Sequence, residues 1–219
     1  MVPTIEVDLL RVAATFFWSA YRGQQPLAIL LGGTTALEVD LSRVRCPILG
    51  VNQSFRLGVT WPRTVAHLIS GRECSTVHVH EVRRLWPKMP TFMVGWPGHA
   101  VPQGVITMRQ AGTFSLNLAE QGIYSMGASV LALQLAVWLG FNEIFFIGLD
   151  LKRRGERLKS WDVKPNPYDA TRDYANQLKA LREGAAVLRA KRPAVRVVNT
   201  SHDTACDAFP IVPFDEVFA

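Results

Sequence analysis

The sequence has few cysteines and no long hydrophobic run, and each of these absences excludes a class of protein. The three cysteines are widely spaced and odd in number, which excludes a disulfide framework and a CxxC-type zinc site. No apolar run approaches the ~20 residues that a membrane-spanning helix needs. Residues 1–10 carry Glu6 and Asp8 where a secretory signal peptide would be basic. We therefore expect a cytoplasmic protein.

Several common functional motifs are absent as well. There is no Gly-x-Ser-x-Gly elbow, which argues against an α/β-hydrolase. The glycine segment 32–35 lacks the lysine of a Walker loop and the third glycine of a dinucleotide fingerprint. His78 and His80 would share one face of a strand, but we identify no third residue to complete a metal site. We therefore predict no metal site.

The composition favours a single folded domain with a sizeable core. The chain has 219 residues, of which 48% are hydrophobic and 19% are charged. Short apolar runs between turn residues predict buried strands, and apolar residues at helical spacing predict helices. We expect strands over 27–31, 47–51, 64–69, 77–81, 90–94, 143–147 and 195–198, and helices over 4–20, 129–139 and 168–191. This alternation predicts an α/β fold, a three-layer sandwich whose mostly parallel sheet has helices on both faces.

The chain divides into an N-terminal amphipathic helix within 1–26 and one domain over 27–219. We expect the apolar stripe of that helix to dock on the domain. A second subunit, giving a homo-oligomer, and peripheral contact with a membrane surface are the alternatives. Residues 151–167 form a polar, basic loop that is long enough to be a lid over a binding site.

The positive charge is concentrated in one stretch. The net charge is +6, and residues 152–192 hold twelve basic and five acidic side chains. Such a stretch predicts an anionic ligand, for example a nucleotide, a phosphorylated substrate, a nucleic acid or a membrane surface. A solvated helix face is an equally good interpretation. No basic motif interleaved with aromatic residues and no helix-turn-helix signature accompanies the charge, which argues against nucleic acid.

Polar or glycine-rich residues follow the predicted strands, and ligands of open parallel sheets bind at that edge. Gly32, Gly33 and Thr34 follow the first strand, where glycines either let the backbone approach a phosphate or simply make a tight turn. Asn52 and Gln53 follow the second strand. Their amides can read the edges of a base or sugar, or can cap the strand.

Two further residues after strands are candidates for catalysis. Asp150 can bind Mg²⁺, hold a ribose hydroxyl or accept a substrate proton, and its alternative is a cap for the next segment. His202 can act as a general base because histidine titrates near neutral pH, and its alternative is a structural role, which is the more frequent one for a single histidine. We predict that Asp150 or His202 is the catalytic base.

The segment Gly-Ala-Ser-Val-Leu-Ala-Leu-Gln-Leu-Ala-Val-Trp-Leu-Gly-Phe-Asn-Glu-Ile-Phe-Phe-Ile-Gly-Leu-Asp over 127–150 resembles the central helix and strand of one superfamily. Its members are the archaeal 6-hydroxymethylpterin pyrophosphokinase-like proteins and the bacterial sialyltransferases of glycosyltransferase family 42. The glycine loop over 31–37, the Asn-Gln motif over 51–55 and the segment 207–212 are similar to further parts of that superfamily. The resemblance covers about residues 27–215.

The resemblance implies a Rossmann-like nucleotide-binding domain. In the sialyltransferases, the glycine loop, the Asn-Gln pair and the start of the central helix hold the CMP part of the donor. The matching positions here are Gly32, Gly33, Thr34, Asn52, Gln53 and Ser129. In the pterin branch the same cleft holds ATP and Mg²⁺, with Asp150 as a metal ligand. One departure is clear, because residues 151–167 contain no histidine where the sialyltransferases carry a catalytic one.

Three functions follow as hypotheses. The leading one is a transferase that uses a nucleotide sugar, such as a CMP-sugar, and moves a glycosyl group as the sialyltransferases do. The alternative is a pyrophosphokinase that acts on a pterin-like alcohol with ATP and Mg²⁺. The third is a nucleotide-binding module without turnover.

Overall fold

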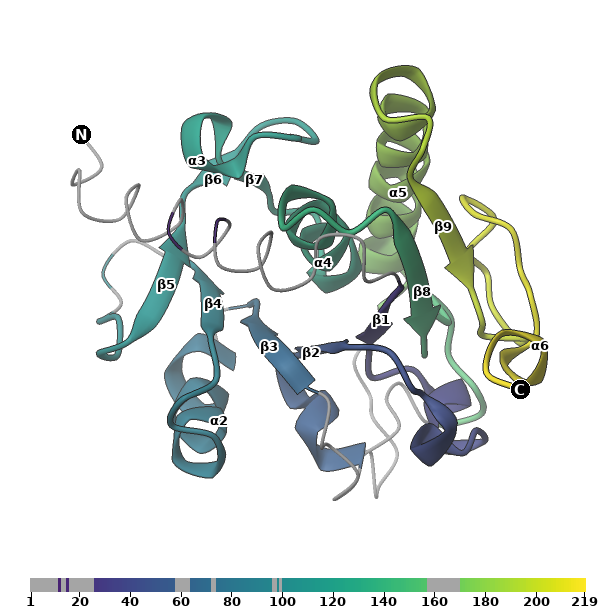
Figure 1. The fold of residues 1–219 in the computed structure, drawn as a ribbon, viewed down its shortest axis with the longest axis horizontal. Helices are drawn as coiled ribbons and strands as arrows, with labels where there is room; N and C mark the ends of the chain where they lie inside the picture. Colours follow the sequence, from purple (N-terminus) through teal and green to yellow (C-terminus); the bar gives the residue numbers. More distant parts are fainter. Residues whose placement is uncertain are drawn as a thin grey trace.

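The structure is a computed structural model, and it describes residues 12, 15, 26–57, 64–71, 74–95, 98, 100–156 and 170–219. A seven-stranded parallel sheet in the order β5-β4-β3-β2-β1-β8-β9 runs through its centre (Figure 1). The strands of this sheet are β1 (Leu27–Leu30), β2 (Ile48–Val51), β3 (Thr64–Ile69), β4 (Thr91–Val94), β5 (Val105–Met108), β8 (Glu143–Ile147) and β9 (Arg196–Asn199). Two short strands, β6 (Gln110–Ala111) and β7 (Ile123–Tyr124), pair separately.

Helices cover both faces of the sheet, so the predicted three-layer α/β sandwich is confirmed. Along β1, Leu27 and Ile29 join one large apolar core, whereas Ala28 and Leu30 join a second core on the opposite face. The first core is closed by the helices α4 (Ala128–Trp138) and α5 (Thr171–Lys191). The second is closed by the 3-10 helix η1 (Thr34–Leu37) and by α6 (Phe214–Val217). A third core lies between α2 (Val79–Leu85) and strands β3 and β4.

The prediction of a strand over 77–81 is wrong. These residues belong to the π-helix η4 (Cys74–His78) and to the start of α2. Val79 and Val82 are three residues apart and pack together into the third core, which is the spacing of a helix face. His78 and His80 therefore do not share a strand face, since the side chain of His78 is buried and that of His80 is exposed.

Other boundaries also differ from the expectations. β5 was not predicted, and the polar segment 115–122 contains the short helix α3 (Leu118–Gln121), whose first turn is capped by the side chain of Asn117. Two more 3-10 helices, η2 (Leu41–Arg43) and η3 (Asn52–Leu57), lie near β2. The predicted helix over 4–20, except for residues 12 and 15, and the basic loop beyond residue 156 lie outside the described residues.

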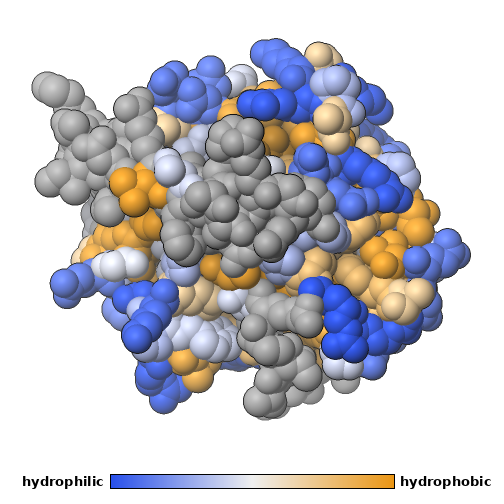
Figure 2. Space-filling model, in the orientation of Figure 1, coloured by the Kyte–Doolittle hydropathy of each residue, from blue (hydrophilic) through white to orange (hydrophobic). Residues whose placement is uncertain are grey.

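The helix α5 explains much of the charge in the basic stretch. Its buried residues are Ala180, Leu181, Gly184, Ala185 and Leu188, which recur at helical spacing. Its charged residues are exposed, and Figure 2 shows hydrophilic side chains in the upper right of the view, where Figure 1 places this helix. Arg182 pairs with Asp207 at 2.5 Å. This part of the stretch is a solvated helix face. No helix in the described part of the chain combines the length and apolar character needed to cross a membrane.

A buried glutamine in α4 forms hydrogen bonds with the backbone of the neighbouring segments at Ser115 and Tyr124. Gln134 is fully buried in a helix whose other residues, apart from Ser129 in its first turn, are apolar. Its Oε1 accepts hydrogen bonds from the backbone N–H groups of Ser115 at 2.9 Å and Tyr124 at 3.0 Å. Its Nε2 donates to the carbonyl oxygens of Tyr124 at 3.0 Å and Val130 at 3.1 Å. One side chain thus satisfies backbone groups that would otherwise be buried without partners.

We predict that Gln134→Leu destabilises the fold. The apolar side chain leaves the N–H groups of Ser115 and Tyr124 without an acceptor, which costs about 2–4 kcal/mol in the free energy of unfolding. Urea denaturation followed by circular dichroism measures the change. The exposed Gln110 gives a matched control, since Gln110→Leu should change the free energy of unfolding by less than about 0.5 kcal/mol. Equal stability of the two variants would contradict the role of Gln134.

Candidate functional site

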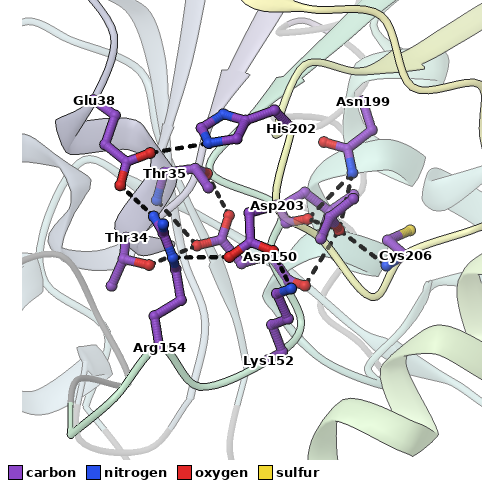
Figure 3. Close-up of polar contacts among 12 residues, drawn as sticks. Thr34, Thr35, Glu38, Asp150, Lys152, Arg154, Asn199, His202, Asp203 and Cys206 are labelled. Atoms are coloured by element: carbon purple, nitrogen blue, oxygen red, sulfur yellow. Dashed lines mark hydrogen bonds and ion pairs between the residues drawn. The ribbon is translucent and has the colours of Figure 1, made fainter.

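The candidate site lies where the strand order of the sheet reverses. The chain builds the sheet outward from β1 to β5, and then returns to place β8 and β9 on the other side of β1. Open α/β sheets bind ligands beyond the carboxyl ends of the strands at such a reversal. Figure 3 shows the loops after β1, β8 and β9 converging at this carboxyl edge.

Asp150, at the end of β8, joins two of these loops. It is buried, and its carboxylate accepts hydrogen bonds from the hydroxyl of Thr34 at 3.1 Å and from the backbone N–H of Thr35 at 3.1 Å. The hydroxyl of Thr35 donates to its other oxygen. Asp150 therefore caps η1, although it lies more than a hundred residues away in the sequence. We call this arrangement of Asp150, Thr34 and Thr35 the carboxylate clamp.

The clamp requires a glycine on each side. A Cβ atom on Gly33 would lie 2.3 Å from the carbonyl oxygen of Gly148 and 2.6 Å from the Cγ of Asp150. Gly148 has a φ of 76°, and a Cβ there would lie 3.0 Å from the carbonyl oxygen of Leu31. The N–H of Gly33 donates to the Gly148 carbonyl at 3.0 Å. The glycines thus serve the close approach of the β1 and β8 loops.

This packing changes the interpretation of the glycine loop. The backbone N–H of Thr35 is the kind of donor that a ligand phosphate would use, and here it already donates to Asp150. Both oxygens of Asp150 accept hydrogen bonds from the chain. The geometry gives Asp150 a positioning role, and its service as a catalytic base stays a prediction, as does phosphate binding by Gly32, Gly33 and Thr34.

A network of charged side chains lies beside the clamp (Figure 3). Arg154, from the β8 loop, pairs with Glu38 at the end of η1 and, at 2.8 Å, with Asp203 from the β9 loop. Lys152 also pairs with Asp203. All four side chains are about one-third to two-fifths exposed. We call Glu38, Lys152, Arg154 and Asp203 the charged network.

The ion pairs of the network shift the pKa values of Asp203 and Arg154. The hydrogen bond from Lys152 holds the pKa of Asp203 below its usual value, with Lys152 and Arg154 adding electrostatic attraction. The hydrogen bond to Glu38 raises the pKa of Arg154, and the negative charges of Glu38, Asp203 and Asp150 act in the same direction. Arg154 therefore keeps its charge at neutral pH, and both Arg154 and Lys152 can share their N–H groups with an anionic ligand.

His202, the other predicted catalytic residue, meets the same network. Its Nε2 lies 3.1 Å from the carboxylate of Glu38, and the side chain is about half exposed. A carboxylate at this nitrogen fixes the tautomer, so that Nε2 carries the proton and Nδ1 is the basic nitrogen. The sequence pointed to His202 and to the basic run that holds Lys152 and Arg154, but it did not reveal Glu38, which contacts both His202 and Arg154. Glu38 carried no sequence signal beyond its place shortly after the glycine loop.

Asn52 stands at the carboxyl end of β2, where its amide is used within the protein. Its Oδ1 accepts from the backbone N–H of Ser70 at 2.6 Å, and its Nδ2 donates to the Ser70 hydroxyl at 3.0 Å. Its backbone has a φ of 50°, which is uncommon outside glycine. These bonds tie the ends of β2 and β3 together, which is the strand-end capping role. Gln53 beside it is half-buried.

Ser129 is placed at the start of α4 and contacts α5. Its hydroxyl donates to the Oε1 of Gln177 at 3.1 Å, and the side chain is buried. Gly127 caps the helix, and a Cβ there would lie 2.1 Å from Gln177. The predicted binding residues thus all lie at the carboxyl edge of the sheet, but Ser129 and Asn52 do not contact the charged network in any recorded interaction. Their roles in ligand binding stay predictions.

The donor set at this edge does not fit the magnesium site that the pterin branch implies. The carboxylates of Asp150, Glu38 and Asp203 are each engaged by hydroxyl, N–H or cationic groups of the chain. Within the ranges that the structure describes, no three His, Cys, Asp or Glu side chains are grouped so that they could hold a metal ion. We derive no step through a metal.

Comparisons with protein-family models, with curated proteins and with solved structures found no match to this chain. The similarity of 127–150 to the pyrophosphokinase and sialyltransferase superfamily therefore remains an expectation. What the protein can bind follows from the geometry of the carboxyl edge.

We predict that Gly33→Ala weakens the fold through the clamp. The added methyl group must displace the backbone of Gly148 or the carboxylate of Asp150, which costs about 2–3 kcal/mol in the free energy of unfolding. A urea titration measures the loss. Gly112 is the control, because a Cβ there meets nothing within 4 Å and its φ lies outside the left-handed region. The close approach is refuted if Gly33→Ala and Gly112→Ala are equally stable.

The burial of His67 in β3 leads us to expect that the free energy of unfolding depends on pH. Complete burial lowers its pKa from 6.5 to about 4, although its Nε2 also bonds the Asn52 carbonyl at 2.7 Å, which acts in the opposite direction. The unfolded chain therefore takes up the proton first as the pH falls. The contribution of the neutral His67 to the free energy of unfolding is fully present above pH 6.5. It is lost as the pH falls from 6.5 to about 4, and the loss amounts to about 3 kcal/mol.

The measurement is urea denaturation of the wild type and of His67→Gln over this pH range. Glutamine cannot take up the proton, but it keeps an amide donor for the Asn52 carbonyl. The difference in unfolding free energy between the two proteins should therefore shrink as the pH falls. Parallel profiles would show that burial does not control the titration of His67.

Proposed function

We propose that this protein is a nucleotide-dependent transferase of the glycosyltransferase kind, whose donor is a nucleotide sugar bound at the carboxyl edge of the sheet. One observation carries the proposal. The pair of His202 and Glu38 lies next to Arg154, which also contacts Glu38, at the reversal of strand order. A base and a cation at one edge are the two groups that glycosyl transfer from a phosphate needs.

The residues divide the chemistry between them. The acceptor hydroxyl attacks the anomeric carbon of the donor, and its proton passes to Nδ1 of His202. The bond from that carbon to the phosphate oxygen breaks, and its electron pair leaves with the nucleotide. Arg154 and Lys152 stabilise the negative charge that develops on the leaving phosphate. Glu38 stabilises the imidazolium that forms on His202.

The carboxylate clamp supports this reaction through positioning. It fixes the loop after β1 to the loop after β8, which carry Glu38 and Arg154 respectively. A base and a cation held on fixed loops keep their separation when the substrate binds, and correct orientation is a large part of catalysis. The clamp therefore acts on the reaction without touching the substrate.

The second candidate is a nucleotide-binding module without turnover. It is favoured by one observation, namely that both carboxylate oxygens of Asp150 accept hydrogen bonds from the chain, so that Asp150 offers no free base to an acceptor. Such a protein would use Arg154 and Lys152 to hold a phosphate group and would have no need of His202 as a base. For both candidate functions we propose that the protein acts in the cytoplasm.

Thermal stability in the presence of nucleotides tests the proposal. We expect CMP, or another member of a panel with CDP, UDP, GDP and ATP, to raise the melting temperature without Mg²⁺. A ligand at about 100 times its dissociation constant stabilises by about 2.7 kcal/mol, which is readily detected. Arg154→Gln should remove the shift. Arg196→Gln is the matched control, because Arg196 is an exposed arginine that pairs with Glu143 at the opposite edge of the sheet.

The variant His202→Gln separates the two candidates. In a transferase it should keep the nucleotide shift but release nucleotide from the sugar nucleotide about 100-fold more slowly, since a general base contributes about that factor. In a binding module no release occurs in either protein. A shift by ATP that needs Mg²⁺ would instead indicate the pyrophosphokinase, and no shift by any nucleotide would overturn the proposal.

A further inference from the structure

A cavity beside the charged network has no role in the proposed chemistry. It has a volume of about 400 Å³ and lies between the loop after β8, the first turns of α5 and the loop after β9. Because α5 runs from the end of β8 to the start of β9, its first turn lies at the carboxyl edge of the sheet. The cavity is therefore on the functional edge. Its size is within the range of about 300–1,000 Å³ that small-molecule sites occupy.

The walls of the cavity are mainly apolar. Leu151, Ala175, Leu178 and Ala205 line it, together with the ring of the half-buried Tyr174. Side chains of this kind gain most by covering an apolar or aromatic group, because burial of such surface removes it from water. A nucleotide phosphate alone would leave these walls uncovered. The lining therefore calls for a ligand with an apolar body.

Two cations stand at the same cavity. Lys152 and Arg153 also belong to the lining, and Lys152 is the residue that pairs with Asp203 in the charged network. An ammonium group has three donors, so Lys152 can keep Asp203 and still bind a second anion. The cavity thus combines apolar walls with positive charge on one side.

The backbone that leads into the cavity is strained. Leu151 has a φ of 49°, a conformation that a branched apolar residue seldom adopts. It directly follows Asp150 of the clamp, and its turn carries the chain on to Lys152 and Arg153 at the cavity. Strain of this kind is commonest at functional sites, where the surrounding structure holds it in place.

We propose that this cavity binds a small amphipathic ligand, a ring or short hydrocarbon group that carries one anionic substituent. The apolar part lies against Tyr174, Leu178 and Leu151, and the anionic group meets Lys152. In the proposed transferase this ligand is the acceptor, and that assignment alone rests on the proposed function. Binding itself depends only on the cavity.

A fluorescent probe with the required chemistry tests the site. Anilinonaphthalene sulfonate has an aromatic body and one anionic group, and phenylnaphthylamine has a similar body without the charge. We expect the wild type to bind the sulfonate at one saturable site, without nucleotide present. Lys152→Gln should weaken the binding of the sulfonate about fivefold. It should leave the binding of the uncharged probe unchanged, since only the sulfonate loses an ion pair.

Two variants fill the cavity from opposite walls. Ala175 and Ala205 are both exposed residues, so Ala175→Trp and Ala205→Trp add an indole without disturbing the core. Each variant should weaken the binding of both probes about tenfold or more. Ala186→Trp is the matched control, because Ala186 is exposed on the same helix, about 16 Å from Ala175. It should bind as the wild type does, and circular dichroism checks that every variant is folded.

A second cavity gives the outcome that would overturn the proposal. It has a volume of about 620 Å³ and lies at the amino edge of the sheet, where Lys191 and Trp138 are among its lining. If Lys191→Gln weakens the probe and the two cavity-filling variants do not, the ligand site is at that edge. Absence of saturable binding by the wild type refutes the site at either edge. Because no nucleotide is used, a failed nucleotide screen leaves this test unaffected.

Discussion

The hydrogen bonds between Asp150 and the loop after β1 are the interaction on which the carboxyl edge depends. They join residues that are 115 or 116 positions apart in the chain, and they hold together the loops that follow the two central strands, where the sheet reverses its order. Gly33 and Gly148 make the contact sterically possible. A buried carboxylate is stable only when its oxygens are satisfied, so Thr34 and Thr35 are as necessary to the arrangement as Asp150 itself.

The charged network depends on this contact. Glu38 is four residues beyond Thr34, and Arg154 is four residues beyond Asp150, so fixing the clamp also brings these two side chains together. His202 and Asp203 come from the third loop and complete the group. The proposed function depends on this arrangement, because the contact of Asp150 with the loop after β1 is what places the proposed base and two cations at one edge of the sheet. The cavity beside Lys152 extends the same edge toward α5.

The central strands and the long helices were predictable because their sequence patterns are local. The apolar runs at 27–31 and 143–147 match β1 and β8, and the helix expected over 129–139 matches α4 to within one residue. The prediction for 77–81 failed because the alternation of valine and histidine suggested a strand, whereas Val77 is exposed and the buried Val79 packs with Val82 at helical spacing. Packing of α2 against β3 and β4 decided it. Among the site residues, position after a strand was predictable, whereas the partner of each side chain was not.

The sequence by itself determined the class of fold and the edge at which the candidate site lies, because alternating strands and helices leave their loops at the carboxyl ends of parallel strands. It also determined that Asp150 and His202 would lie at that edge. Only the tertiary structure decided what each does there. Asp150 meets the threonines of the first loop, whereas His202 meets Glu38. The physical reason is that a side chain's role depends on the donors and acceptors brought to it by distant segments, and local spacing carries no record of them.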